Sequence, residues 1–465
     1  MLNLELTNII NTCNGRLYLP AGMSEDDLIH RKPQGVVLDS REAGKDYIFV
    51  AYKGEKVDGH SFIEQVAQKG ALAVICENVP EDISIPCIRV ENSLDALIKL
   101  AKAYKSMLDV TTVGIVGSVG KTSTKEMVAG VLSQRYKVMK GLGNHNNLLG
   151  LSLEILRITS DIQMTVLEMG ISDFGEMKRL SELVRPDTVV FTNIGECHLE
   201  FLGDRDGVLR AKTECFEYMN PDGYVVLNGL DDKLNTIEDV NGKRPYRVGT
   251  EGNDVYATDV KINGVYGSDL KLHIAMGKDM AGDVHITIPG AHMVINSLEA
   301  AAVGAIYGLT MEEISAGIGD VRALPGRSNV IDSGKYLIID DCYNANGASM
   351  KAAIDLLATA NGRKVAILGD MFELGERSDE IHREIGRYVV SKGIEVLCFV
   401  GDNAQNMYKA AMSDIMCEYQ SVSHFESLEE LKKRLPSVLE ESDTILVKAS
   451  HGMRFSEVVD FLVKL

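Results

Sequence analysis

The stretch GIVGSVGKTST, residues 114–124, constrains the fold of this chain more than any other feature of its sequence. It lies between the β-branched run TTVGIVG and the helical pattern TSTKEMVAGVLSQRY, so it predicts a strand, a phosphate-type loop and a helix in direct succession. Gly114, Gly117 and Gly120 allow the backbone to turn tightly and to present N–H groups to phosphate oxygens. The N-terminus of the following helix adds a partial positive charge at the same place.

The residue types in this loop indicate how it would hold a nucleotide. Lys121 would bridge the β- and γ-phosphates, and Thr122 would offer a hydroxyl to Mg²⁺. The strict GxxxxGK[ST] pattern is not met, because Ile115 stands where the first glycine should be and the spacing is GxxGxxGKT. A glycine-rich turn without a ligand is the alternative interpretation. The predicted ATP contacts in the loop are Gly117, Ser118, Gly120, Lys121, Thr122 and Ser123.

The pattern of strands and helices predicts an α/β fold with three domains. Buried-type strands (MTVLEM, DTVVFTNIG and YVVLNG) alternate with helical stretches after the loop, which is typical of a parallel sheet covered on both faces. Pro325 and Gly326 indicate a linker. Four further strands predict a Rossmann-like domain, although no GxGxxG follows the first of them. We expect a smaller N-terminal α/β domain (1–108), a central P-loop domain (109–324) and a C-terminal Rossmann-like domain (325–465).

Charge and cysteine usage limit the partners and the compartment. The net charge of −19 disfavours nonspecific binding to nucleic acid or anionic membranes. No apolar run reaches the roughly 18 residues of a membrane span, and the first residues, MLNLELTNIINTC, do not resemble a secretory signal. The eight cysteines are scattered and form no CxxC, which favours free thiols in a reducing cytoplasm. We expect a cytoplasmic protein, without membrane insertion, that needs no oligomer.

Three polar residues outside the loop differ in what their positions alone predict. Glu168 ends the apolar strand MTVLEM, and a carboxylate at the carboxyl end of a strand beside a phosphate loop is well placed to hold Mg²⁺. His198 follows another strand end in TNIGECHLEFLG, where a lone histidine is more often structural. Lys212 lies in a predicted helix, where a lysine is by default a solvated surface charge.

The arrangement GxxGxxGKTxT resembles the loop of the Mur ligase family and of its folylpolyglutamate synthetase relatives. Val119 departs from the family pattern, which has Asn there. The resemblance implies that Glu168 binds a first Mg²⁺ with Thr122, and that His198 binds a second. It also implies that Lys212, in RAKTECF, is a carbamylated lysine that coordinates the metal, so the catalytic set would be Lys121, His198 and Lys212.

The resemblance extends to segments on both sides of the central domain. Asn296 in GAHMVINSLEAAAV matches the family asparagine that hydrogen-bonds adenine. Arg327 matches the arginine that reaches ATP phosphates across the cleft, and Asp341 matches the acid that contacts the ribose. In the N-terminal unit, LDSREAGKDYIFVAYKGEKVDGHSFI resembles the uridine-nucleotide segment, which implies that Ser40 and Arg41 contact the UDP-sugar.

Three patches (GNHNNLLG, DDCYNAN and LGDMFELGERS) resemble the branch of the family whose amine substrate is D-alanyl-D-alanine. Departures are Gly347, where Pro is usual, and His451, where Arg is usual. The resemblance implies UDP-N-acetylmuramoyl-tripeptide as the acid substrate and an acyl-phosphate intermediate. A relative acting on another acid, and a P-loop nucleotide-binding module without ligase activity, remain alternatives. The candidate substrate contacts in these patches are Asn144, Asn147, Tyr343 and Asn344.

Overall fold

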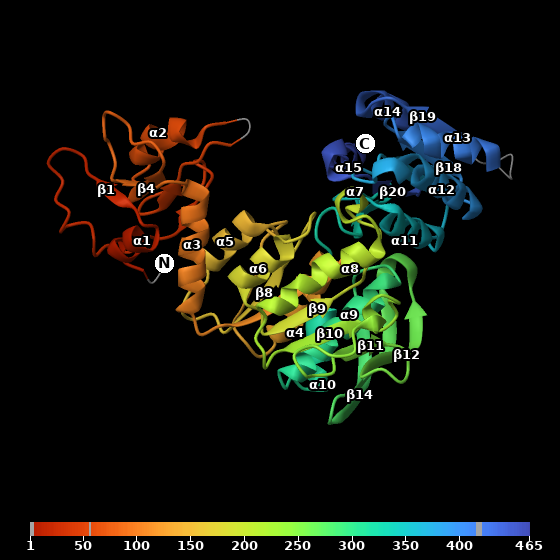
Figure 1. Cartoon of the computed structure of the whole chain (residues 1–465). Helices are drawn as coiled ribbons and strands as arrows, with labels where there is room; N and C mark the ends of the chain where they lie inside the picture. The colour runs from red at the N-terminus through yellow and green to blue at the C-terminus, as the bar shows by residue number, and fades with distance from the viewer. Residues whose placement is uncertain (1–3, 55–56, 415–420) are drawn as a thin grey trace.

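The computed structural model describes residues 4–54, 57–414 and 421–465. Three separate sheets follow one another along the chain, and each is built from its own part of the sequence (Figure 1). The expected α/β class with three sheet units is confirmed. No helix within these three ranges is both long enough and apolar enough to cross a membrane. Seven cysteines in the described part of the chain are free, and Cys417 lies outside it.

The N-terminal unit is a five-stranded sheet in the order β1-β5-β4-β3-β2, in which β1 alone is antiparallel to its neighbour. Strands β2 and β3 lie in the sequence runs VVLDS and YIFVAYKG. Helix α3 begins after Asn92, whose side chain accepts a hydrogen bond from the Asp95 N–H. The elements are α1 (Leu6–Thr12), β1 (Arg16–Tyr18), β2 (Val36–Val37), β3 (Ile48–Val50), α2 (Ile63–Gln68), β4 (Ala73–Cys76), β5 (Cys87–Arg89) and α3 (Ser93–Ser106).

The central unit is a nine-stranded sheet in the order β14-β13-β12-β11-β10-β9-β6-β8-β7. Strands β6 to β11 are parallel to their neighbours, as the buried-type strands predicted, and β12 is parallel to β11. The elements before the loop at residue 203 are β6 (Thr111–Val116), α4 (Lys121–Leu132), β7 (Val138–Lys140), α5 (Leu148–Leu156), β8 (Met164–Glu168), α6 (Glu176–Val184), β9 (Thr188–Phe191) and α7 (Leu199–Leu202). Those after it are α8 (Arg205–Thr213), β10 (Tyr224–Asn228), β11 (Tyr246–Gly249), β12 (Val255–Ile262), β13 (Ser268–Ala275), β14 (Asp279–Ile286), α9 (His292–Ile306) and α10 (Met311–Gly319).

The parallel sheet was an incomplete prediction, because β12, β13 and β14 continue it as an antiparallel meander. Residues along β13 alternate between buried and exposed, which is the signature of a strand with one wet face. Strands joined by short turns run antiparallel, whereas the parallel part needs helical crossovers. The meander extends the sheet at the edge beyond β11 (Figure 1).

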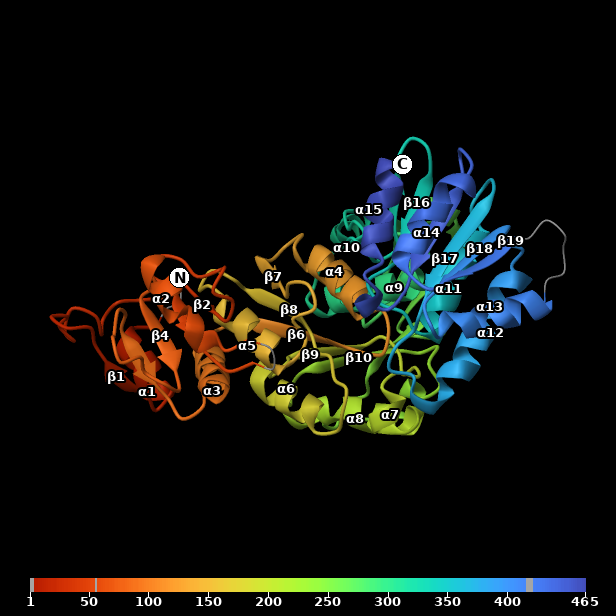
Figure 2. The same cartoon turned by 90° about the horizontal axis from the view of Figure 1, so that it is seen from above.

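The C-terminal unit is a six-stranded sheet in the order β15-β16-β20-β17-β18-β19, parallel except for β15. The four predicted strands are β16, β17, β18 and β20. Helices α11, α12 and α13 pack on one face, and α14 and α15 pack on the other (Figure 2). The elements are β15 (Asn329–Asp332), β16 (Leu337–Asp340), α11 (Gly347–Ala358), β17 (Lys364–Gly369), α12 (Ser378–Ser391), β18 (Val396–Val400), α13 (Ala404–Asp414), β19 (Ser421–Phe425), α14 (Leu428–Arg434), β20 (Thr444–Lys448) and α15 (Ser456–Lys464).

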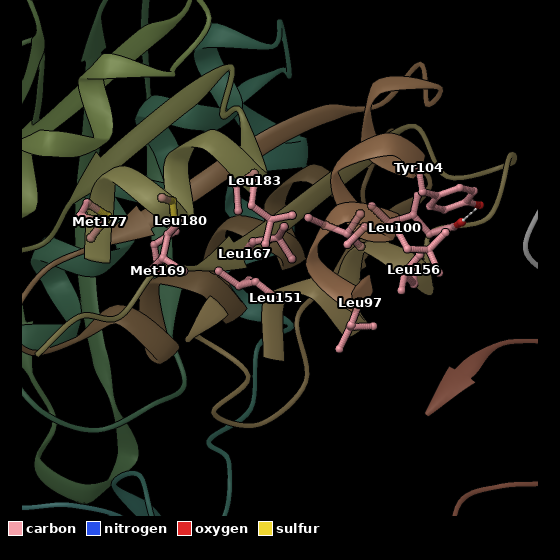
Figure 3. Close-up of a cluster of buried hydrophobic side chains, with 14 of the residues drawn as sticks. Leu97, Leu100, Tyr104, Leu151, Leu156, Leu167, Met169, Met177, Leu180 and Leu183 are labelled. Atoms are coloured by element: carbon pink, nitrogen blue, oxygen red, sulfur yellow. Dashed lines mark hydrogen bonds between the residues drawn. The ribbon is translucent and has the colours of Figure 1, made fainter. Parts of the chain in front are cut away.

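Helix α3 fastens the N-terminal unit to the central sheet. Its Leu97, Leu100 and Tyr104 side chains lie in one buried apolar cluster with leucines of α5 and α6 (Figure 3). Each fully buried leucine contributes about 1.5–3 kcal/mol relative to exposure. The Tyr104 hydroxyl also donates to the Ile158 carbonyl at 2.6 Å. These contacts place the N-terminal sheet beside the end of the central sheet that carries α5.

Candidate active site

The glycine-rich loop joins β6 to α4 and has the conformation that its glycines predict. Gly120 precedes α4 with a φ of 85°, and Gly117 has a φ of 154°. A Cβ at Gly117 would lie 1.9 Å from the Thr192 hydroxyl oxygen, so only glycine fits there. The Lys121 ammonium donates to the Gly117 carbonyl at 2.9 Å, which holds this cation over the loop.

The segment after β9 braces the loop from the side. The side-chain amide of Asn193 forms two hydrogen bonds with the Val119 backbone. Its Oδ1 accepts from the Val119 N–H at 3.0 Å, and its Nδ2 donates to the Val119 carbonyl at 3.1 Å. The Thr192 hydroxyl donates to the same carbonyl, and the Gly195 N–H donates to the Ser118 hydroxyl at 2.9 Å. The loop shape at position 119 is therefore fixed through the backbone, which explains how it tolerates valine. Sequence reasoning missed Asn193 and Thr192, although both directly follow a strand end.

Glu168 is the last residue of β8, lies next to the phosphate loop and is 7% exposed. The Thr122 hydroxyl donates to its Oε2 at 2.8 Å, and the Asn146 amide donates to its Oε1 at 2.9 Å. Burial would raise the pKa of this carboxyl, but Lys121, Asn146 and Arg327 outweigh burial and hold the pKa below its usual value. An ionised carboxylate beside a hydroxyl is a donor set that suits Mg²⁺.

Within GNHNNLLG, Asn146 is the asparagine whose side chain contacts Glu168, and sequence reasoning did not single it out. Asn147 is used as the N-cap of α5, where its Oδ1 accepts from the Gly150 N–H at 2.9 Å. Asn144 is exposed and contributes to the environment of Tyr343. The predicted substrate contacts of Asn144 and Asn147 remain predictions.

Lys212 is not the solvated surface charge that its helical position would suggest. Its side chain is 1% exposed, and its ammonium donates to the Gly117 carbonyl at 3.1 Å. The two acids that follow Lys212 in the sequence do not pair with its ammonium. Glu214 accepts from backbone N–H groups, and Glu217 pairs with Lys178. Burial, together with the nearby Lys121, lowers the pKa of Lys212 to about 8. A substantial neutral fraction near physiological pH is what reaction with CO₂ requires.

His198 lies at the start of α7 with its backbone in the left-handed region, at a φ of 51°. Its Nδ1 lies 3.1 Å from Oε2 of Glu373, which comes from the C-terminal unit. Burial lowers the pKa of this imidazole against the opposing effect of Glu373, and Lys212 and Lys121 lower it further. No group of three His, Cys, Asp or Glu side chains in the described ranges is arranged to hold a metal; the predicted set also uses Thr122 and Lys212.

Arg327 enters the site from the segment that connects the central and C-terminal sheets. Its guanidinium lies 3.9 Å from the ring centroid of Tyr343, a cation–π distance. The Tyr343 ring lies 5.3 Å from the His451 ring, and Arg327 is close enough to Glu168 to help lower its pKa. Arg327 and Tyr343 therefore lie near the Glu168 carboxylate of the central sheet.

The remaining nucleotide candidates are held by neighbouring protein groups. Asp341 accepts from the Ser328 N–H at 2.8 Å and pairs with the buried Lys448 ammonium at 2.6 Å. Lys448 also donates to the Asn344 carbonyl at 2.9 Å. Asn296 is buried, and a Cβ at Gly120 would lie 3.4 Å from its Oδ1. Asn296 therefore lies beside the loop; its adenine contact and the ribose contact of Asp341 remain predictions.

The uridine candidates belong to the N-terminal unit, between β2 and β3. Ser40 is buried, and its carbonyl accepts from the Lys69 ammonium at 2.8 Å. Arg41 is exposed and holds Asp39 through Nε and Nη2, which lowers the pKa of that carboxyl to about 2. The structure thus gathers Lys121, Glu168, His198, Lys212 and Arg327 around the phosphate loop, whereas Ser40 and Arg41 belong to a different sheet.

Helix α4 packs against α9 behind the loop, and the buried carboxyl of Glu299 lies between them. This carboxyl makes the free energy of unfolding depend on pH. Glu299 accepts from the Thr124 hydroxyl at 2.9 Å, its Oε1 has no partner among the described residues, and burial raises its pKa from 4.5 to about 8. Between these pH values the unfolded chain has lost this proton and the folded chain retains it, so stability falls as pH rises. The expected slope is about 1.4 kcal/mol per pH unit; above pH about 8 both states are ionised and the slope ends.

Glu299→Gln isolates this contribution, because the amide keeps the shape and cannot ionise. We expect the difference in unfolding free energy between the variant and the unsubstituted protein to grow from pH 5.5 to 7.5, measured by urea denaturation. Other titrating groups cancel in that difference. Two parallel stability curves over this range would show that Glu299 has an ordinary pKa.

Comparison with known proteins agrees with this geometry. Family models match residues 32–105 (Mur ligase family, catalytic domain), 115–304 (Mur ligase middle domain) and 326–451 (Mur ligase, glutamate ligase domain). The chain is 35% identical to the UDP-N-acetylmuramoyl-tripeptide–D-alanyl-D-alanine ligase of Bacillus subtilis, covering 100% of this chain and 99% of that protein. It is 32% identical to the enzyme of the same name from Escherichia coli, over 99% and 98% of the two chains.

Solved structures show the same similarity over the whole length. MurF from Acinetobacter baumannii superposes with a TM-score of 0.88 at 28% identity, covering 100% of both chains. MurF ligase from Thermotoga maritima, solved in complex with ADP, superposes with a TM-score of 0.79 at 28% identity, covering 95% of this chain and 99% of that one.

Proposed function

The chain belongs to the Mur ligase family, and from that premise we propose that it is an ATP-dependent ligase that joins D-alanyl-D-alanine to UDP-N-acetylmuramoyl-tripeptide. The product would be the amide-linked peptidoglycan precursor. The observation that carries the proposal is the cluster of side chains at the loop: Lys121 and Lys212 both donate to the Gly117 carbonyl, and Thr122 donates to an ionised Glu168. Full-length similarity to ligases of this name supports the choice of substrates.

The reaction that fits this site has two steps. The terminal carboxylate of the tripeptide attacks the γ-phosphorus of ATP, so that ADP leaves and an acyl phosphate forms. The amine of D-alanyl-D-alanine then attacks the acyl carbon, and phosphate leaves as the amide bond forms. Lys121 and the loop N–H groups would neutralise charge on the transferred phosphoryl group. Arg327 is placed by its stacking on Tyr343 to add a second positive charge.

The donor sets favour two divalent cations. Thr122 and Glu168 would hold one Mg²⁺, and His198 with a carbamylated Lys212 would hold the other. When bound, Mg²⁺ would supply positive charge next to the phosphate oxygens. The burial of Lys212 and its lowered pKa support carbamylation, because only the neutral amine reacts with CO₂.

Each sheet unit would carry one ligand: residues 1–108 the UDP-substrate through Ser40 and Arg41, 109–324 the ATP, and 325–465 the amine. Asn296 and Asp341 would contact the adenosine, whereas Tyr343 and Asn344, together with Asn144 and Asn147 of the central unit, would contact the peptides. We also propose that the protein acts in the cytoplasm as a monomer. The free thiols support a reducing compartment, and the acidic charge weighs against nonspecific binding to nucleic acid or anionic membranes.

Phosphate release and product mass test this proposal. We expect release only when ATP, Mg²⁺, UDP-tripeptide and D-alanyl-D-alanine are all present, with a product heavier by the dipeptide less one water. Transfer of a single amino acid to a UDP-dipeptide, or of glutamate to a folate, would assign the chain to another branch of the family. ATP hydrolysis that ignores both peptide substrates would instead favour a nucleotide-binding module without ligase activity.

A further inference from the structure

Two loops from different sheets meet beside the phosphate site. The loop after β9 carries Glu196 and His198, and the loop after β17 carries Glu373 and Arg377. Arg377 Nη1 donates to Glu196 Oε1 at 2.7 Å, and Glu373 Oε2 lies 3.1 Å from His198 Nδ1. One ion pair and one carboxylate–imidazole contact therefore join the C-terminal unit to the segment that flanks the phosphate loop.

Both members of the second pair have constrained backbones. His198 and Glu373 have φ values of 51° and 62°, in a region that non-glycine residues adopt only when the surrounding structure enforces it. The buried His382 fixes the loop of Glu373, since its Nε2 accepts from the Met371 N–H at 3.0 Å and its Nδ1 lies 2.7 Å from the Ser378 carbonyl oxygen. The loop that carries Glu373 is thus held at both ends by His382.

The loop that carries His198 is the same one that braces the phosphate loop. Asn193 and Gly195 contact Val119 and Ser118 through the hydrogen bonds described above. A displacement of His198 would therefore be transmitted to the loop backbone over three residues. No hydrogen bond engages Nε2 of His198 in the described part of the structure, which leaves that nitrogen available to a cation.

We propose that Glu373 is a positioning residue for the divalent-cation site, supplied to it by the C-terminal unit. The proposal rests on the proposed function in one respect, the use of His198 as a cation ligand. A carboxylate against one imidazole nitrogen orients the ring and makes the other nitrogen a better ligand. Because Glu373 belongs to another sheet unit, cation binding and docking of the C-terminal unit favour each other, as reciprocal linkage requires.

The plain alternative is a surface ion pair without further effect. Glu373 is 66% exposed on its side chain, and exposed pairs of this kind contribute little to stability. The two interpretations differ in cation affinity, which a surface ion pair would leave unchanged. They also differ in residue specificity, because Glu376 carries the same charge on the same loop and is also exposed, yet forms no ion pair with His198 in the described part of the structure.

Mn²⁺ is a suitable probe, because its free concentration can be read by electron paramagnetic resonance with full-length protein and ADP, without peptide substrates. We expect Glu373→Ala to weaken Mn²⁺ binding about tenfold or more. Glu373→Gln keeps the side-chain size and one acceptor oxygen. Its Mn²⁺ affinity should lie between that of Glu373→Ala and that of the unsubstituted protein. Glu376→Ala is the matched control and should bind Mn²⁺ as the unsubstituted protein does, and all variants should melt at the same temperature.

Equal Mn²⁺ affinity in Glu373→Ala and Glu376→Ala would overturn the inference, as would the absence of any saturable Mn²⁺ site. Arg377→Ala removes the ion pair with Glu196 but leaves His198 untouched, so it should weaken Mn²⁺ binding less. An effect of Arg377→Ala as large as that of Glu373→Ala would assign the result to general docking instead. Failure of the ligase assay with the Mn²⁺ difference intact would reject the proposed substrates and leave the role of Glu373 standing.

Discussion

Lys121→Ala is expected to lower kcat by about 10²–10³-fold or more, the cost of removing one preorganised charge from a transition state. Lys121 is the first residue of α4, and its ammonium is already fixed on the Gly117 carbonyl at 2.9 Å. The charge therefore needs little rearrangement when phosphate enters. The residue is only partly buried and forms no ion pair in the described structure, so the melting temperature should be almost unchanged.

The measurement is steady-state phosphate release with all substrates saturating, together with the affinity for ADP. Lys178→Ala is the matched control, because it removes a lysine whose exposed pair with Glu217 has no contact with the loop. Lys121→Arg separates charge from geometry, since the guanidinium keeps the charge but not the compact ammonium. If Lys121→Ala retains half of the activity, the loop does not hold the transferred phosphoryl group.

The sequence was most informative where the chemistry is local. The glycine spacing and the strand–helix junction predicted the loop, and Gly117 and Gly120 adopt the positive φ values that the turn needs. Strand patterns with buried residues on both faces predicted the parallel core and the last sheet. The antiparallel meander was missed, although β13 alternates between buried and exposed residues in a way that the sequence SDLKLHIA displays.

The contacts that complete the site depend on tertiary structure, and therefore could not be read from spacing. Asn193 and Asn146 look like loop asparagines in the sequence, and only the fold shows that one braces Val119 and the other binds Glu168. The burial of Lys212 could not be predicted from local sequence either. Its helix has polar neighbours on most sides, so nothing local indicates that the side chain is fully buried under the loop; resemblance to the family was the only signal.

Lys212→Ala is the second substitution with a large expected effect, a loss of about 10²–10³-fold in kcat if it removes a charge from the same transition state. The structure leaves two roles open for the charge. As an ammonium, Lys212 would join Lys121 on the Gly117 carbonyl and contact phosphate directly. As a carbamate it would be an anion, and its oxygens would be hard ligands for Mg²⁺.

The pKa of about 8 allows carbamate formation but does not decide between these roles, because the neutral fraction of the amine rises as pH passes through that value. The sign of the charge on the small ion that restores activity to Lys212→Ala distinguishes the two roles. Lys212→Ala leaves a buried space where the side chain lay, so a small ion from solution can replace it. If the working group is the carbamate, acetate should restore part of the activity and methylamine should not. If methylamine restores it and acetate does not, Lys212 acts as a cation and the carbamate role is excluded.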